Sequence, residues 1–491
     1  MNWPKVMLPD IQKLSERRLV LGLAILSGVL IFWNLGGAAL IDWDESIYAA
    51  VAREMAEGGD WLTLHWNRET FFEKPPLYFW LTAGMFKIFG VSEFAARFWS
   101  ALAGVLGTCV VYLFGKKLFG RVAGISAGLV LATTIHWVFQ SRNGMLDVFA
   151  ATLILLTLYF FWLGWERGGR LRHWGLFGAC AGLVFLAKGP VVVIPLSVVT
   201  IFALADISSG GFSGGYSKLL RGGVFAALTF LVVAMPWHIL MYRRYGADFI
   251  DEYIFYHMLA RARSGIEEHG RPFLWYLVVI KHWARLWAAT LLVGLLVFLR
   301  RTLRGFLRDE ARPLALCLLW LILTFLIFSA SASKIQWYIV PIYPPIALLC
   351  GYFLDLLARW LAPYSGRRDF PSLFMVAVFL FGIFGLLSRR TQWYVGDYNR
   401  GFAEASAMMA EVSDEGHKLL VAGAAPGVPI FYSRRKVETA KVSHIYQLSV
   451  RGHKFFAVSR QQILEDIEQL YPDVRLETFY KDFGYALYGR R

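Results

Sequence analysis

Long apolar runs separated by short polar segments dominate the chain up to residue 388. They lie at 19–41, 93–115, 122–140, 145–164, 174–187, 189–205, 220–241, 273–299, 313–330, 336–358 and 371–388. An α-helix needs about 20 mostly apolar residues to cross a bilayer, and most of these runs approach that length. The pattern therefore predicts an all-α polytopic membrane protein with about 11–13 transmembrane helices. Shorter, half-buried helices are predicted near 76–90 and at the start of the 273–299 run.

The pattern changes after Arg389, where apolar segments become short and alternate with charged ones. A helix-like segment at 402–412 precedes strand-like segments at 418–423 and 454–459, a helix pattern at 460–470, and two aromatic strand-like segments near the end. Ser459 is the predicted N-cap of the 460–470 helix. This pattern predicts a soluble α/β domain over 389–491, following a membrane domain over 1–388.

Basic residues gather in five short loops between the apolar runs. The loops contain Lys116, Lys117 and Arg121; Arg167, Arg170 and Arg172; Lys218 and Arg221; Arg300, Arg301, Arg304, Arg308 and Arg312; and Arg359, Arg367 and Arg368. Counting the spans places all five loops on the side of the N-terminus. Since basic loops stay in the cytoplasm, the N-terminus is predicted to be cytoplasmic. The loops 42–92 and 243–271 and the C-terminal domain then lie outside, in the periplasm if the membrane is a bacterial inner membrane.

Composition supports a membrane protein and excludes several other classes. Hydrophobic residues make up 57% of the 491 positions, whereas soluble domains are about half apolar. The net charge of +15 lies largely in the short basic loops, so it gives no support to nucleic-acid binding. No Walker-type or dinucleotide-binding glycine-rich loop is present, which leaves nucleotide use unsupported. The four cysteines all lie inside apolar runs and have no metal-ligand spacing.

Ionisable residues next to the membrane are concentrated on the predicted outer face. They are Asp44, Glu45, Glu73, Lys74, Asp147, Lys188, His257, Arg261, Arg263 and Lys334, with Tyr338 just inside the following helix. Charges this close to a bilayer are costly and need partners or a function. Cations can hold a phosphate, while a carboxylate can act as a base or stabilise a cationic sugar-like transition state. Because nucleotide sugars are absent from that side, the set favours a lipid-linked donor.

Several motifs follow one another along the chain. They are Asp44-Glu45 with Tyr48, Arg53-Glu54-Met55, Gly59-Asp60-Trp61, Phe72-Glu73-Lys74-Pro75 with Tyr78, Leu146-Asp147, Lys188-Gly189, His257 with Arg261, and Lys334-Ile335 with Tyr338 and Pro341. Together they resemble the lipid A aminoarabinose transferases and the wider protein O-mannosyltransferase-like group of the GT-C superfamily. Each motif is weak alone, but the ordered set covers nearly the whole chain. The chain is therefore similar to an inverting membrane glycosyltransferase that takes its sugar from a polyprenyl-phosphate carrier.

The resemblance also implies roles for individual residues. Asp44 matches the central catalytic carboxylate, with Glu45 and Asp147 as further catalytic carboxylates. The donor phosphate is expected to bind Lys74, Arg261 or Arg263, Tyr338 and Lys334. Glu73 and His257 match positions that can hold a divalent metal ion, and no other cofactor is expected. The implied partners are a polyprenyl-phosphate-linked sugar, a lipid A, glycan or protein acceptor, and the membrane lipids.

Two departures and several alternatives stay open at this point. Ile47 stands where aminoarabinose transferases have Arg, and Arg261 is one residue further from His257 than usual. Both departures leave the sugar undecided among aminoarabinose, another amino sugar, a hexose and a uronic acid. Asp44 could instead cap a helix, and Lys74 could be an interfacial lysine. A lipid or glycan transporter, a flippase, or a non-catalytic partner of a lipid-glycan machine are the other functions that fit.

Overall fold

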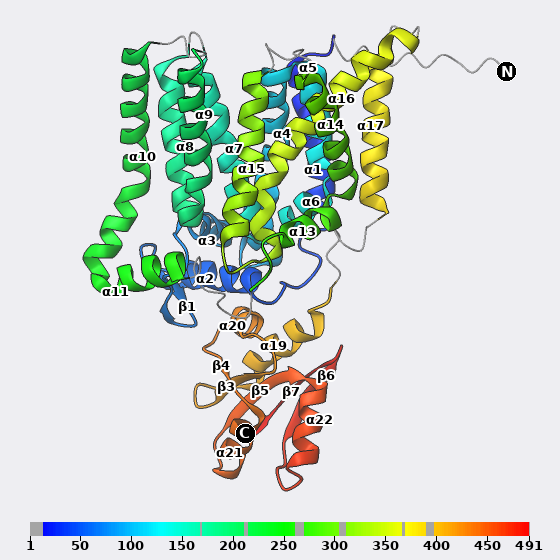
Figure 1. Ribbon diagram of the computed structural model, residues 1–491. Helices are drawn as coiled ribbons and strands as arrows, with labels where there is room; N and C mark the ends of the chain where they lie inside the picture. Colours follow the sequence, from blue (N-terminus) through cyan, green and yellow to red (C-terminus); the bar gives the residue numbers. More distant parts are fainter. Residues whose placement is uncertain are drawn as a thin grey trace, which may run out of the picture.

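The computed structural model describes residues 13–166, 169–210, 215–260, 270–303, 311–365, 369–388 and 397–490. A helical bundle forms one end of the molecule and a small sheet domain the other, with α2 between them (Figure 1). The bundle helices are α1 (Glu16–Phe32), α4 (Glu93–Phe119), α5 (Arg121–Ala132), α6 (Ile135–Ser141), α7 (Leu146–Trp165), α8 (Leu171–Lys188), α9 (Val193–Ser208), α10 (Tyr216–Tyr245), α13 (Trp275–Trp283), α14 (Arg285–Leu303), α15 (Ala311–Ala330), α16 (Tyr343–Ser365) and α17 (Phe370–Leu387).

Seven helices in the described residues are long and apolar enough to cross a membrane, or nine if each bent pair is one span. The bent pairs are α5 with α6, at 61°, and α13 with the first part of α14, at 112°. The count of nine takes Leu171–Ser208 as one helix and does not include α1, which has 17 residues. The predicted all-α polytopic membrane fold is confirmed, as are the half-buried helices α3 (Leu77–Phe89) and α13.

The segment from Leu171 to Ser208 is a hairpin of two antiparallel helices, as the two separate apolar runs predict. Trp165, at the end of α7, contacts Trp174 near the start of α8, with ring centroids 6.2 Å apart. The same indole donates a hydrogen bond of 2.7 Å to Asp206 near the end of α9. Both ends of the segment therefore lie at the same level, and the chain reverses at the 3₁₀ turn Gly189–Val192. Gly189 has a φ of +54°, which glycine adopts readily.

The basic loops meet at one end of the bundle, opposite the sheet domain. Lys116 pairs with Glu16 at 2.6 Å, Lys117 pairs with Glu166 at 2.8 Å, and Arg312 pairs with Asp206 at 2.7 Å. These pairs join loops that are far apart in the sequence. The shared side that the span count predicts for the basic loops is thus supported by direct contacts.

The first outer loop and the loop 243–271 form short elements at the other end of the bundle. They are α2 (Asp44–Gly58), the hairpin of β1 (His65–Trp66) and β2 (Glu69–Thr70), α3, α11 (Ala247–Phe249) and a π-helical segment, Ile250–Ala260. A 3₁₀ segment, Gln336–Ile342, leads into α16. Figure 1 shows α2 and α3 lying beneath the bundle, on the side of the sheet domain.

The C-terminal domain is α/β, as the sequence predicts. It contains α19 (Arg400–Val412), β3 (Lys418–Ala422), α20 (Gly427–Ser433), β4 (Glu438–Thr439), α21 (Val442–Val450), β5 (Phe455–Arg460), α22 (Gln461–Leu470), β6 (Glu477–Asp482) and β7 (Tyr485–Arg490). The strand order is β4-β3-β5-β7-β6; β3 pairs parallel with β4 and β5, and β7 pairs antiparallel with β5 and β6. The predicted N-cap is wrong: Ser459 is the fifth residue of β5, and Arg460 occupies the N-cap position of α22.

The C-terminal domain packs directly on α2. One apolar cluster joins Val51 and Met55 of α2 to Phe431 and Phe456 of the domain. Arg53 donates hydrogen bonds to the carbonyls of Ile430 and Phe431 at the end of α20, at 3.0 and 2.5 Å. Backbone N–H groups of Ala425 and Val428, at the start of α20, bond to the carboxylate of Asp42. The end of α20 is therefore attached to α2, and its start to Asp42, two residues before α2.

Candidate active site

A cavity of about 360 Å³ opens where the outer loops meet the ends of the bundle helices. Its polar lining includes Tyr48, Glu73, Lys74, Asp147, Lys188, His257 and Tyr338, and its apolar lining includes Val191, Ile194, Ile327, Phe328 and Trp337. Six of the residues that the sequence singles out thus line one space, although they come from separate segments. A lining that combines charged and apolar groups suits an amphiphile that carries a phosphate.

Asp44 is the first residue of α2, and Tyr48, one helical turn later, lines the cavity. The preceding residue, Trp43, has a φ of +72°, a conformation that is costly for a residue with a Cβ. Burial raises the pKa of Asp44. The positive charges of Lys74 and Lys188 oppose this rise, whereas Asp147 and Glu73 add to it. Asp44 is not among the residues that line the cavity, but all four of these charged neighbours are.

Two ion pairs form among the charged residues that line the cavity. Lys188 pairs with Asp147, and its ammonium lies 5.1 Å from the centre of the Tyr338 ring. Lys74 pairs with its neighbour Glu73 at 3.5 Å. Pro75 and Pro76 follow Lys74 and restrict the backbone that carries it, just before α3 begins. The cavity lining therefore contains two lysines, each of which forms an ion pair with a carboxylate of the same lining.

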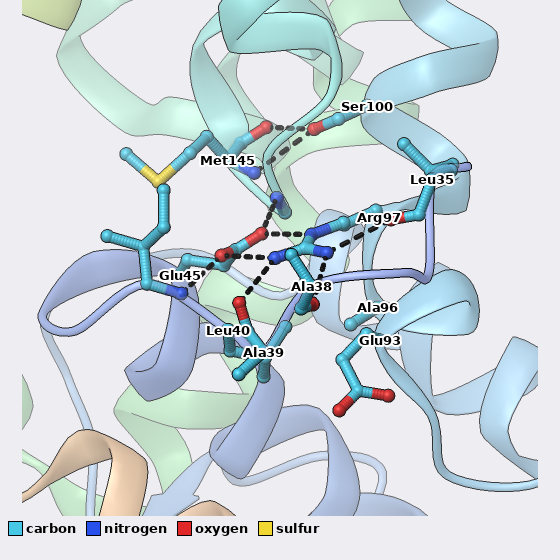
Figure 2. Close-up of polar contacts among 12 residues, drawn as sticks. Leu35, Ala38, Ala39, Leu40, Glu45, Glu93, Ala96, Arg97, Ser100 and Met145 are labelled. Atoms are coloured by element: carbon cyan, nitrogen blue, oxygen red, sulfur yellow. Dashed lines mark hydrogen bonds and ion pairs between the residues drawn. The ribbon is translucent and has the colours of Figure 1, made fainter. Parts of the chain in front are cut away.

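Glu45 has contacts that favour a positioning role over the predicted catalytic one. Figure 2 shows its carboxylate in an ion pair with the Arg97 guanidinium, with N–O distances of 2.8 and 3.0 Å. It also accepts hydrogen bonds from the backbone N–H groups of Ile41, at 2.6 Å, and Gly144, at 2.7 Å. Glu45 is only 2% exposed and is not part of the cavity lining.

Arg97 completes this buried cluster and is the main residue that the sequence analysis missed. Its guanidinium also donates to the carbonyls of Leu35, Ala38 and Ala39 at 2.8–3.0 Å (Figure 2). The pair of Glu45 and Arg97 thus joins the α1–α2 connection, the start of α2 and the turn before Asp147. An arginine inside an otherwise apolar run is expensive without a partner, and this was the available signal.

Lys334 is also placed away from the cavity lining. Its ammonium donates hydrogen bonds to the carbonyls of Arg271, at 3.0 Å, and Ser331, at 2.5 Å. Ser333 forms an isolated β-bridge with Gly270 at the same point. Burial lowers the pKa of Lys334. These contacts join two outer loops, so they favour a structural role for Lys334 over the predicted phosphate contact.

The predicted metal ligands Glu73 and His257 line the same cavity. They offer one carboxylate and one imidazole, which is short of the ligand number that a structural or catalytic zinc ion takes. Among the residues that the structure describes, no group of three His, Cys, Asp or Glu side chains could hold a metal ion. The predicted phosphate ligands Arg261 and Arg263 lie outside the described residues.

Ile47 does not face the cavity. Its side chain packs against the C-terminal domain, where it would be 3.2 Å from a Cβ added at Gly427. An arginine here would meet α20 instead of the donor phosphate, so the expected loss of a phosphate-binding cation at this position is not supported.

Comparisons with known proteins agree with this architecture. The family model described as dolichyl-phosphate-mannose-protein mannosyltransferase matches residues 73–239. ArnT from Cupriavidus metallidurans, solved with bound undecaprenyl phosphate, is similar over 97% of this chain and 98% of its own, with a TM-score of 0.77 and 20% identity. An oligosaccharyltransferase from Archaeoglobus fulgidus has a TM-score of 0.61 and 15% identity over 91% of this chain and 70% of its own. This chain has the GT-C fold. The resemblance that the motifs indicate is therefore confirmed.

Curated relatives match a shorter part of their own length. An undecaprenyl phosphate-α-4-amino-4-deoxy-L-arabinose arabinosyl transferase from Pseudomonas paraeruginosa is 30% identical over 63% of this chain and 55% of its own length. An uncharacterized protein from Aquifex aeolicus is 26% identical over 72% of this chain and 75% of its own length. The chain thus spans little more than half of the first of these two relatives.

Proposed function

We propose that this GT-C protein is an inverting glycosyltransferase that moves a sugar from a polyprenyl-phosphate donor to an acceptor on the outer face of the membrane. The observation that carries the proposal is the cavity whose lining combines Lys74, Lys188 and Asp147 with apolar residues. An isoprenoid phosphate has matching parts, a charged head and an apolar chain. The named relatives that use undecaprenyl phosphate support the same donor class.

In the proposed reaction, the two lysines and the Asp44 carboxylate have separate tasks. Lys74 and Lys188 bind the donor phosphate and stabilise the negative charge that grows on it as the bond between the sugar C1 and the phosphate oxygen breaks. The acceptor oxygen attacks C1 from the opposite face, which inverts the configuration. Asp44 takes the acceptor proton, so the products are the glycosylated acceptor and the lipid phosphate. Because burial raises the pKa of Asp44, its carboxylate is more basic than an exposed one, which favours its use as a general base.

Binding of the donor phosphate provides the direct test. Lys74→Ala is expected to weaken binding of undecaprenyl phosphate by roughly ten- to a hundred-fold, because a charge-assisted contact worth about 1.5–3 kcal/mol is lost. A thermal-shift titration in detergent measures the affinity, with undecaprenol as the ligand that lacks phosphate. Lys87→Ala, at an exposed lysine in the last turn of α3, is the matched control. Equal affinity in Lys74→Ala and the parent would place the phosphate elsewhere.

We further propose that the membrane is a bacterial inner membrane, with the N-terminus in the cytoplasm and the cavity and C-terminal domain on the periplasmic side. Glu415→Cys, at an exposed position in the C-terminal domain, is expected to react with a membrane-impermeant maleimide in intact spheroplasts. Ser209→Cys, at the end with the basic loops, is expected to react only after permeabilisation. The native cysteines are buried and give little background. The reverse labelling pattern would reverse the topology and move the cavity to the cytoplasm.

A further inference from the structure

A second cavity lies at the seam between the first outer loop and the C-terminal domain. It has a volume of about 500 Å³ and is lined by Arg53, Glu54, Glu57, Gly58, Asp60, His65, Arg68, Arg434 and Arg435. These residues come from the end of α2, from the β1–β2 hairpin and from the end of α20. We call this space the seam cavity. It shares no lining residue with the cavity that holds Lys74 and Lys188.

Arginines from three segments converge on the seam cavity. Arg53 is 2% exposed, and its Nε is buried without a hydrogen-bond partner. Burial lowers the pKa of Arg53. The negative charges of Glu57 and Glu54 oppose this change, and the positive charges of Arg434 and Arg68 add to it. Arg434 and Arg68 are exposed. Like charges that converge in this way repel one another, and an anion bound between them would remove that cost.

The acidic residues of the seam cavity offset only part of the arginine charge. Glu54 accepts hydrogen bonds from the backbone N–H groups of Asn67 and Arg68, at 2.9 and 3.1 Å. Asp60 accepts two backbone N–H groups and pairs with Arg244 outside the cavity. Glu57 is shared between Arg53, at 3.5 Å, and Arg434, at 3.9 Å. The lining thus has four arginines and three carboxylates, of which Asp60 also serves a cation outside, so an excess of positive charge remains.

The backbone holds two of these arginines in unfavourable conformations. Arg68 has a φ of +65° and Arg434 a φ of +57°. Residues with a Cβ adopt such angles at a cost, which persists only where the surrounding structure enforces it. The Asn67 side chain joins the turn of the hairpin to the segment after α20, because it donates to the Val437 carbonyl at 2.9 Å and accepts from the Val437 N–H at 3.0 Å. The hairpin and the end of α20 are thereby fixed relative to each other before any ligand binds.

We propose that the seam cavity binds a carboxylate or phosphate group of an acidic glycan that serves as the acceptor. The proposal rests on the transferase function proposed above. About 20 Å of helix separates Glu57 from Asp44, at about 1.5 Å per residue. A molecule that reacts at Asp44 and also reaches the seam cavity must therefore extend over several sugar units. Arg68 and Arg434 hold its negative charge and orient the chain along α2.

Binding of a soluble acidic oligosaccharide tests the cavity without any turnover. The full chain in detergent is titrated with tetragalacturonate, and with maltotetraose as the neutral counterpart. The double variant Arg68→Asn/Arg434→Asn is expected to bind tetragalacturonate at least tenfold more weakly than the parent. Because Asn tolerates positive φ, this variant should unfold at the same temperature as the parent or higher. Arg451→Gln/Arg475→Gln removes two exposed arginines of the C-terminal domain and is the charge-matched control.

A variant that is expected to bind the ligand more tightly distinguishes a change at the anion site from a folding defect. Glu57→Gln removes the carboxylate that competes for Arg53 and Arg434, so tetragalacturonate is expected to bind several-fold more tightly. Equal affinity in the parent and in both seam variants, or equal binding of maltotetraose, would overturn the seam cavity as an anion site.

Mass spectrometry of surface glycans and lipids tests the acceptor role in cells that lack the chain and receive each variant. Arg68→Asn/Arg434→Asn is expected to reduce the transferred sugar at least tenfold, whereas the charge-matched control restores it. Full restoration by the seam variant would overturn the acceptor role. If the parent itself changes no glycan or lipid, the proposed transferase function fails, while the binding titration still decides the anion site.

Discussion

Asp44→Asn is expected to lower sugar transfer by about 10²–10⁴-fold, the usual contribution of a general base. The substitution removes the negative charge with little change in volume, so the protein should remain folded in detergent. Turnover of a polyprenyl-phosphate sugar by the purified chain is the measurement. Glu69→Gln, at an exposed carboxylate of the β1–β2 hairpin, is the matched control and should retain full turnover. Near-parental turnover in Asp44→Asn would remove Asp44 from the central role.

The pH dependence separates loss of a base from loss of structure. Asp44 acts in its charged form, so activity should fall as the pH drops through its pKa. The negative charge of Glu73 raises that pKa, and the positive charge of Lys74 lowers it. Glu73→Gln is therefore expected to move the acidic limb of the kcat/KM profile to lower pH, and Lys74→Met to higher pH. If the acidic limb moved in the same direction in both variants, the assignment of Asp44 as the base would be contradicted.

Hydropathy was sufficient to predict the membrane architecture because the bilayer permits few solutions. A membrane span must be long, apolar and internally hydrogen-bonded, so each long apolar run in the sequence predicts helical structure. Even the sharp bend between α13 and α14 follows a run that is too long for one ordinary span. The α/β character of the C-terminal domain was predictable from its short alternating segments, whereas its packing on α2 was not. That packing depends on side chains such as Arg53, which looks like any surface arginine in the sequence.

Six of the residues that the sequence singles out line the cavity, but the partners and the role of each could not be predicted. Residue type and position cannot tell whether a charged side chain points into a cavity or joins two loops. Asp147 and Lys188 line the cavity as a pair, whereas Glu45 and Lys334 turn away from it and bind backbone groups. Arg97 escaped the analysis because it lies inside an apolar run, where its partner Glu45 is distant in the sequence.

The buried pair of Glu45 and Arg97 leads to the second large effect. Arg97→Met is expected to destabilise the protein by about 3–5 kcal/mol, because it leaves a buried carboxylate without its counter-charge. It also removes the donor from three backbone carbonyls of the α1–α2 connection. The temperature at which the detergent-solubilised protein unfolds is the measurement. Arg172→Met, at an exposed arginine on the opposite end of the bundle, is the control and should unfold like the parent.

The double variant shows whether the charge itself causes the loss. Glu45→Gln/Arg97→Met contains no isolated buried charge, so it is expected to unfold at a higher temperature than Arg97→Met alone. Glu45→Gln alone should be the mildest of the three, since Arg97 still donates to the carbonyls and an amide still fits the pocket. A double-mutant cycle then gives the coupling between the two residues, which is expected to be large because they are in direct contact. Additive effects would mean that the two residues stabilise the protein independently, and that an isolated buried charge is not the cause of the loss in Arg97→Met.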